Sequence, residues 1–272
     1  MFSKYLASTI AAFLGISNAA CNYGTSEFPR EPNVPASKFS YTGLTGPLNW
    51  YGLNETANAM CDKGMNQSPI NIVTTNATIT HGASVSLNIP SYPGGADFEN
   101  LGTNVEVVVN GTLIDANKTY SLAQFHFHTT SEHRINNEYY PMEIHFVLEA
   151  ADKTIAVVGF LIDFGPTDPL LSSVFASVSE IPSPGNVTLT GPLDFSILQY
   201  HLTHNTIYRY EGSLTTPPCS EKVKWIIGTK PLYIDVDTYK EVKKVVKFNA
   251  RYTQDGLGQA NLLENAATEL NR

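Results

Sequence analysis

One short segment, QFHFH at Gln124–His128, restricts the fold of this chain more than any other. Successive side chains of a β-strand point to opposite faces, so Phe125 and Phe127 would share one face and His126 and His128 the other. The phenylalanines belong in a hydrophobic core. A histidine beside such a core costs free energy unless a hydrogen bond or a metal holds it. The segment therefore predicts a strand with a polar site on one face.

A second segment, MEIHFVLEA, has the same two-residue spacing, with Glu143 and His145 on one face. If the two segments pair as neighbouring strands, His126, His128 and His145 converge. Three histidines with an open fourth position form the ligand set of a catalytic zinc site, and neutral imidazole suits zinc. Gln124 and Glu143 would lie where they can accept the second ring N–H of a ligand histidine.

The competing interpretation is a set of ordinary hydrogen-bonded core histidines. A single H-x-H pair would not exclude it, but H-x-H together with E-x-H on a neighbouring strand is far more specific. His133 follows Glu132 and lies one position off the pattern, so we predict a structural role for it. The remaining histidines, His81, His201 and His204, lie in polar stretches that resemble loops, and no role is predicted for them.

The rest of the chain is dominated by β-branched and aromatic runs, which are typical of strands. The predicted strands are residues 105–109, 122–128, 142–150, 154–162 and 223–229. Two helices are predicted, one with Pro169 in its first turn and one beginning at a capping box of Thr238 and Glu241. We expect a mainly β single domain over residues 39–272, built around a large central sheet with small peripheral helices. Residues 21–38 would form an irregular arm.

The first twenty residues have the pattern of a secretory signal peptide. Lys4 precedes an apolar run at Leu6–Ile16, and SNAA supplies small residues for cleavage near Ala19 or Ala20. That run is too short to span a bilayer, and no second hydrophobic segment follows. The sequence therefore predicts a secreted, extracellular protein without a membrane segment.

Charge excludes one class of partner. The net charge is −8, and it becomes −9 once Lys4 is removed with the signal peptide. The one basic cluster, at Lys240–Lys247, is typical of the solvent face of a helix. Without a basic stripe to contact phosphates, we expect no nucleic-acid binding.

Six N-x-S/T triplets and three cysteines fit an oxidising compartment. Pro69 after Ser68 makes the second triplet the weakest, and some triplets arise by chance. Cys61 and Cys219 are the favoured disulfide pair, but spacing alone does not establish it. Cys21 would then be left over, which would permit a covalent homodimer. The candidate glycosylation sites are Asn54, Asn66, Asn76, Asn110, Asn117 and Asn186.

Taken in order, the motifs resemble the α-class carbonic anhydrases over residues 39–254. The matching segments are QSPINI (67–72), QFHFH (124–128), SEH (131–133), EIHFV (143–147), AVVGFL (156–161), GSLTTPPC (212–219) and FNARYTQ (248–254). No single motif is decisive, whereas the ordered set is highly specific. The resemblance implies a large twisted, mainly antiparallel sheet and the zinc-dependent reversible hydration of carbon dioxide to bicarbonate.

The resemblance also implies a role for individual residues. Zinc would be held by His126, His128 and His145; Thr215 would be the gatekeeper, with Glu132 as the acceptor of its proton. Gln124 and Glu143 would support the ligands, with Asn249, Arg251 and Tyr41 as further supporting residues. The substrate pocket would be lined by Val147, Val157, Leu214, Thr215, Thr216, Val223 and Trp225. Secreted members of the family carry the disulfide that corresponds to Cys61–Cys219.

Two departures from the family pattern affect the predicted mechanism. Thr129 and Thr130 replace the tryptophan and glycine that commonly follow H-x-H, and the proton-shuttle position falls on Leu101 or Gly102. Neither of these two side chains can carry a proton. A non-catalytic binding module is the main alternative, but the complete histidine set argues against it. A zinc esterase is the other, and the apolar pocket argues against that.

Overall fold

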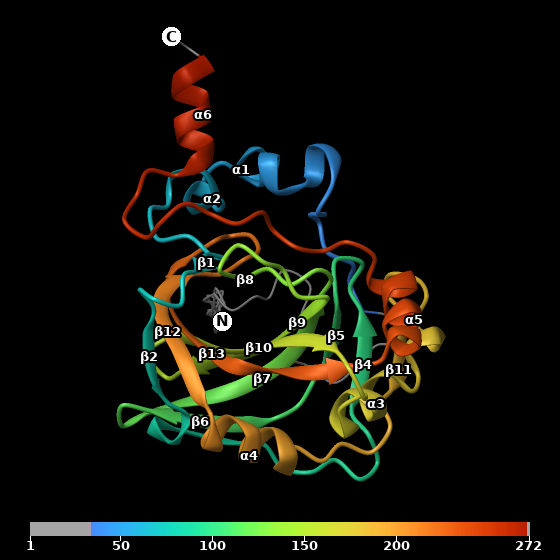
Figure 1. The fold of residues 1–272 in the computed structure, drawn as a ribbon. Coiled ribbons are helices and arrows are strands. Elements are labelled where there is room, and N and C mark those ends of the chain that lie inside the picture. Colours follow the sequence, from blue (N-terminus) through green and yellow to red (C-terminus); the bar gives the residue numbers. More distant parts are fainter. Residues whose placement is uncertain (1–33, 271–272) are drawn as a thin grey trace, which may run out of the picture.

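The computed structural model describes residues 34–270. The predicted signal peptide, most of the predicted arm and Cys21 lie outside these residues. An 11-stranded sheet dominates the described chain, with the strand order β11-β4-β5-β7-β9-β10-β13-β12-β2, while β6 pairs with β7 and with β3 (Figure 1). Its pairs are antiparallel except for β10 and β13. A separate parallel pair, β1 and β8, completes the strands.

The strands are β1 (Asn71–Ile72), β2 (Thr78–His81), β3 (Val85–Asn88), β4 (Asp97–Asn100), β5 (Val105–Val107), β6 (Gly111–Asp115), β7 (Lys118–His128), β8 (Arg134–Ile135), β9 (Met142–Ala150), β10 (Ile155–Phe164), β11 (Val187–Leu189), β12 (Thr206–Ser213) and β13 (Glu221–Ile234). The α-helices are α1 (Trp50–Leu53), α2 (Ala59–Lys63), α3 (Pro169–Phe175), α4 (Ser196–His204), α5 (Val236–Val246) and α6 (Leu262–Leu270). The predicted mainly β single domain is confirmed.

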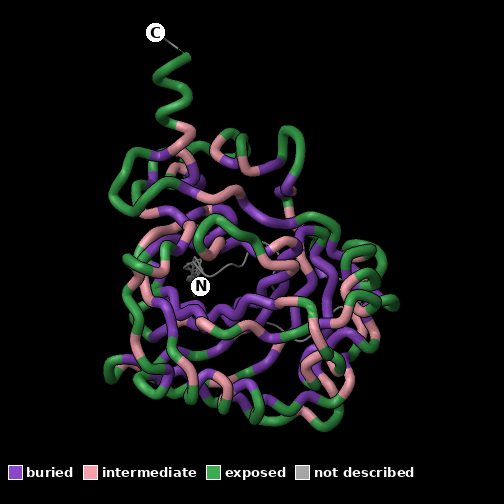
Figure 2. Tube along the Cα trace, viewed as in Figure 1, coloured by how far each residue is buried: buried purple, intermediate pink, exposed green. Residues whose placement is uncertain are grey.

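The hydrophobic core lies on the phenylalanine face of the central strands. Phe125 and Phe127 of β7 pack there with Phe146 of β9 and Phe160 of β10, and all four are fully buried. Apolar residues of α3, α4 and α5 belong to the same cluster, so these helices cover that face. Figure 2 shows the buried residues concentrated along the sheet, with exposed residues on the peripheral turns and helices. The opposite face of β7 and β9 is left for polar side chains.

Two local predictions were wrong, the start of the second helix and the loop assignment of three histidines. The second predicted helix begins one turn earlier than the proposed capping box, because the Asp235 side chain accepts the backbone N–H groups of Asp237 and Thr238. His201 and His204 lie on α4, and His81 ends β2, so none of these histidines is in a loop. The predicted helix α3 is present with Pro169 in its first turn, and the Asp168 side chain caps it by accepting the Leu170 backbone N–H.

The predicted disulfide is confirmed. Cys61 on α2 is bonded to Cys219 in the loop after β12, with 5.0 Å between the Cα atoms. Both cysteines are fully buried against a small aromatic cluster that contains Phe39 and Trp50. The bridge therefore ties the N-terminal part of the described chain to the loop that carries Thr215. Within residues 34–270, no helix is long and apolar enough to cross a membrane.

Candidate metal centre

The register of β7 and β9 brings the three predicted ligands together. His126 lies opposite His145, and His128 lies opposite Glu143. The ring centroids of the three histidines are 4.6–5.4 Å apart, and one nitrogen from each ring lies within 4.8 Å of the others. The three side chains are buried. The predicted pairing and convergence are thus present.

A separate acceptor fixes the orientation of each ring. Gln124 Oε1 lies 2.9 Å from His126 Nδ1, and the Asn249 carbonyl oxygen lies 2.8 Å from His128 Nδ1. Glu143 Oε1 lies 2.8 Å from His145 Nε2. When each of these nitrogens donates, the other nitrogen of the ring keeps its lone pair. His128 Nε2 is buried and has no hydrogen-bond partner among the described residues.

The electrostatics of the triad suit a metal. Burial lowers the pKa of all three histidines, to about 4 for His128. The neighbouring imidazoles lower the pKa of His126 further. At neutral pH the rings are therefore uncharged, which is the form that binds a cation. Three convergent lone pairs, one of them without a hydrogen-bond partner among the described residues, fit a divalent transition metal such as zinc.

His133, Glu143 and His145 form a second group with metal-ligand spacing. We assign the metal to the other group, because both ring nitrogens of His133 are already used. His133 Nδ1 lies 2.7 Å from Glu143 Oε1, and Nε2 lies 2.6 Å from the Tyr210 hydroxyl. The predicted structural role of His133 agrees with these contacts.

Glu132 and Thr215 lie beside the triad. Glu132 is fully buried, its Oε1 accepts the Arg251 backbone N–H at 2.8 Å, and its Oε2 lies 3.5 Å from His128 Nε2. Burial raises the pKa of Glu132 to about 7, while His145, the Arg251 N–H and the Thr215 hydroxyl act to lower it. A divalent cation held by the triad would favour the ionised carboxylate still more.

The predicted apolar wall forms one cluster next to the triad. Trp225 is the member of this cluster that contacts the triad, with its ring centroid 4.9 Å from that of His145. Its Nε1 donates a hydrogen bond to the Ser213 carbonyl at 3.0 Å. Thr215 and Thr216 are buried in the adjoining loop. The cluster contains every apolar residue predicted for the pocket: Val147, Val157, Leu214, Val223 and Trp225.

The predicted supporting residues act in different ways. Asn249 holds the strand that carries the ligands, because its amide donates to the Phe127 carbonyl at 2.8 Å. Arg251 is fully buried and donates to Gln67 Oε1 at 2.9 Å and to the Ser68 carbonyl at 2.8 Å. Tyr41 packs edge-on against Trp50 in the aromatic cluster beside the disulfide.

The two residues to which the resemblance assigns the proton-shuttle position carry no ionisable side chain. Leu101 is buried, and Gly102 is exposed with a φ of 82°. Among the other histidines, His201 lies 5.9 Å from Phe160, on the phenylalanine side of the sheet. His204 shares α4 with His201, and its Nδ1 contacts the Tyr200 carbonyl. These two rings are separated from the triad by the sheet.

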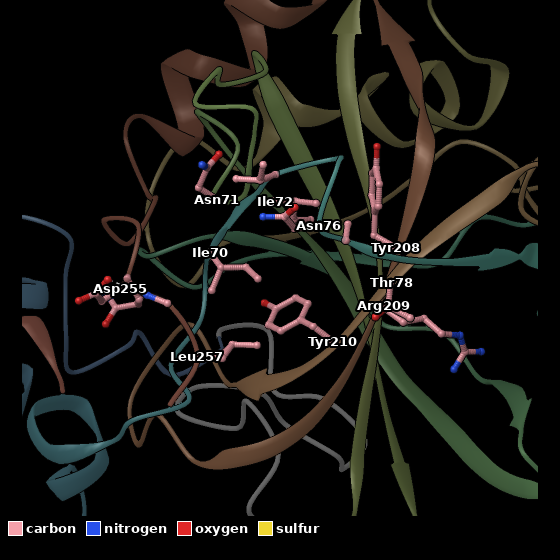
Figure 3. A pocket seen from close by; sticks show the side chains of 14 residues that line it. Ile70, Asn71, Ile72, Asn76, Thr78, Tyr208, Arg209, Tyr210, Asp255 and Leu257 are labelled. Carbon is pink, nitrogen blue, oxygen red and sulfur yellow. Dashed lines mark hydrogen bonds between the residues drawn. The ribbon is translucent and has the colours of Figure 1, made fainter. Parts of the chain in front are cut away.

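A second cavity, of about 510 Å³, lies away from the triad, between β1, β12 and residues 254–257 (Figure 3). Ile70, Ile72, Tyr208, Tyr210 and Leu257 supply much of its wall. The sequence contained no signal for this cavity or for Tyr210, which is half-buried in its wall. The hydroxyl of Tyr210 nevertheless reaches His133, so this residue belongs to the surroundings of the metal centre.

Comparisons with known proteins agree with this geometry. The family model described as eukaryotic-type carbonic anhydrase matches residues 45–266. A fungal alpha carbonic anhydrase from Aspergillus oryzae is 50% identical and has a TM-score of 0.83, with 86% of this chain and 100% of that chain covered. A carbonic anhydrase of Neisseria gonorrhoeae is 37% identical over 70% of this chain and 73% of its own length. A dioscorin crystallised with ascorbate is 31% identical, with a TM-score of 0.71 over 80% of this chain and 94% of that one.

Proposed function

The chain belongs to the eukaryotic-type carbonic anhydrase family and hydrates carbon dioxide reversibly, and we propose that it does so with a zinc ion held by His126, His128 and His145. The observation that carries the proposal is the buried His128 Nε2, which has no hydrogen-bond partner among the described residues and lies among two further ring nitrogens. A buried polar atom without a partner is costly, and a bound metal removes that cost.

A zinc ion held by the three histidines would lower the pKa of a bound water to about 7 and would so supply a nucleophile at neutral pH. We assign the orientation of that nucleophile to Thr215, whose hydroxyl oxygen would accept a hydrogen bond from it. The hydroxyl proton of Thr215 must then be donated elsewhere, and the Glu132 carboxylate is the acceptor beside it. The Arg251 backbone N–H holds Glu132 in place at 2.8 Å.

The substrate is small and apolar, so its site needs shape and dryness more than hydrogen bonds. Val147, Val157, Leu214 and Val223 form a continuous apolar surface with Trp225, next to His145. Such a surface excludes competing water and leaves carbon dioxide beside the nucleophile. Thr216 is buried in the same loop as Thr215, and we place the bicarbonate product beside these two residues.

Two alternatives are weaker. A binding module on this fold would not need a complete ligand set, yet all three rings and their three acceptors are present. An esterase would need room and donors for a larger substrate, whereas the wall next to the triad is apolar.

We further propose that the protein is a secreted glycoprotein with the signal peptide at residues 1–20. The buried disulfide supports an oxidising compartment. Four of the candidate asparagines are exposed, namely Asn54, Asn76, Asn110 and Asn117, while Asn66 and Asn186 are half-buried. A homodimer bridged by Cys21 stays a prediction, because Cys21 lies outside the described residues.

One experiment tests the zinc assignment. The purified protein should contain one zinc ion per chain by elemental analysis, and stopped-flow assays should show carbon dioxide hydration that a chelator abolishes and added zinc restores. Hydration that persists in protein shown to be metal-free would refute the zinc mechanism. Zinc binding without hydration would favour the binding module.

A further inference from the structure

A continuous chain of hydrogen bonds leads from one ligand of the metal centre to a tyrosine, with two other side chains between them. His145 contacts Glu143, Glu143 contacts His133, and His133 contacts Tyr210, with distances of 2.8, 2.7 and 2.6 Å. We propose that Tyr210 is a positioning residue for the metal centre, which sets the protonation pattern of His133 and through Glu143 holds His145 as a ligand. The inference rests on the zinc site proposed above.

Glu143 is the junction of this chain. Its Oε1 faces His145 Nε2 and His133 Nδ1, and its Oε2 accepts the backbone N–H groups of Glu132 and His133 at 2.8 and 2.9 Å. Four nitrogens therefore face its two oxygens, and two of them are backbone N–H groups that can only donate, so Glu143 is placed as an acceptor. An ionised carboxylate only accepts hydrogen bonds. Both histidine nitrogens that face it must therefore carry protons.

The same reasoning fixes the other nitrogen of each ring. Since His145 donates from Nε2, its Nδ1 keeps the lone pair needed by a metal. Since His133 donates from Nδ1, a neutral ring must accept a hydrogen bond at Nε2. The atom that faces this nitrogen is the Tyr210 hydroxyl. Without a donor there, a buried acceptor would lose its partner, and the opposite tautomer of His133 would become competitive.

The surroundings of Tyr210 make its hydroxyl a donor. Ser68 Oγ lies 2.8 Å from it, and the same Ser68 oxygen accepts the Ser213 backbone N–H at 3.0 Å. The Ser68 proton is therefore available to the Tyr210 oxygen, whose own proton is left for His133. Burial raises the pKa of Tyr210 well above its ordinary value, so the group stays a neutral phenol.

Trp225 packs against three of the side chains in this hydrogen-bond chain. The ring centroids of His133 and His145 lie 4.7 and 4.9 Å from that of Trp225. The Tyr210 ring is parallel to the Trp225 ring within 5°, with 6.0 Å between the centroids. Tyr210 also lines the second cavity (Figure 3). The support of a metal ligand thus extends through the protein to the wall of that cavity.

The test uses zinc-loaded protein and the substitution Tyr210→Phe, which removes only the hydroxyl. Tyr208→Phe is the matched control, because Tyr208 is on the same strand, lines the same cavity and belongs to the same cluster. The first measurement is the rate of zinc loss to a chelator, and the second is the melting temperature of each variant. Loss of a hydrogen-bond partner that touches a metal ligand weakens metal binding about 10- to 100-fold, and we expect the lower end for this more distant residue.

We expect Tyr210→Phe to release zinc about 10-fold faster than Tyr208→Phe, without a matching difference in melting temperature. Equal release rates for the two variants, or a faster release that only follows a lower melting temperature, would overturn the proposal. If Tyr210→Phe does not fold, nitrogen NMR of the histidine rings in the parent protein decides. A neutral His133 with its proton on Nδ1 supports the chain, and either a proton on Nε2 or a charged ring overturns it. A parent protein that holds no zinc would instead refute the proposed function.

Discussion

Removal of the Cys61–Cys219 bridge should lower the stability of this protein by several kcal/mol. The proposed variant is Cys61→Ala with Cys219→Ala. Alanine is preferred to serine because both positions are fully buried, where a hydroxyl without a partner would add its own cost.

The magnitude follows from the length of chain that the bridge closes. The two cysteines are 158 residues apart in the sequence. In the chain-entropy model, a loop of this size corresponds to roughly 5 kcal/mol of stabilisation. For a domain of this size, each kcal/mol changes the melting temperature by about 2–4 °C. The double variant should therefore melt about 10–20 °C below the parent protein.

The assay is thermal unfolding followed by circular dichroism, with both proteins zinc-loaded at the same pH. Cys21→Ala is the control, since it removes the third cysteine without affecting the bridge. The folded double variant should also hydrate carbon dioxide more slowly, because Thr215 lies in the loop that the bridge anchors. A decrease in melting temperature of less than about 2–4 °C, which corresponds to about 1 kcal/mol, would refute the entropic reasoning.

His128→Ala should lose zinc and activity together, and a variant that kept stoichiometric zinc would contradict the ligand assignment. Thr215→Ala should keep zinc but turn over about 100-fold more slowly, since only an oriented hydrogen bond is lost; unchanged kinetics would contradict the gatekeeper role. Because Leu101 and Gly102 carry no proton, hydration should rise with the concentration of an imidazole-type buffer at constant pH and ionic strength, and a rate independent of buffer would reveal another shuttle. The pKa of His128 in the metal-free protein lies near 4, below its unfolded value of about 6.5, so the unfolded state binds more protons in that interval. The free energy of unfolding of the metal-free protein should therefore fall as the pH drops from about 6.5 to 4, and a flat profile from chemical denaturation would contradict this.

The metal ligands could be predicted from the sequence because strand periodicity is a local property. His126 and His128 share a face whatever the rest of the fold does, and only the pairing with His145 had to be assumed. The acceptors Gln124 and Glu143 were found by the same spacing. Each of these residues lies two positions from the ligand that it supports.

The contacts that could not be predicted join distant segments or use the backbone. His128 is oriented by the Asn249 carbonyl, 121 residues away, and a backbone oxygen gives no sequence signal. Tyr210 meets Ser68 across 142 residues, and only the folded sheet brings them together. The helix α4 was missed because its polar and aromatic residues resemble a loop, and the start of α5 was misplaced because Thr238 competed with the stronger cap at Asp235.

The alternation of phenylalanine and histidine along β7 has a consequence for the strength of metal binding. A shift of one residue in the pairing with β9 would send Phe125 and Phe127 to the polar face, so burial of these rings selects the register. The favourable free energy of forming the hydrophobic core thereby offsets the conformational-entropy cost of bringing the three ligands together. A metal ion arriving afterwards meets a preorganised chelate and loses little of its binding free energy to ordering the chain. Substitutions on the phenylalanine face, remote from any ligand atom, would therefore weaken the affinity for the metal.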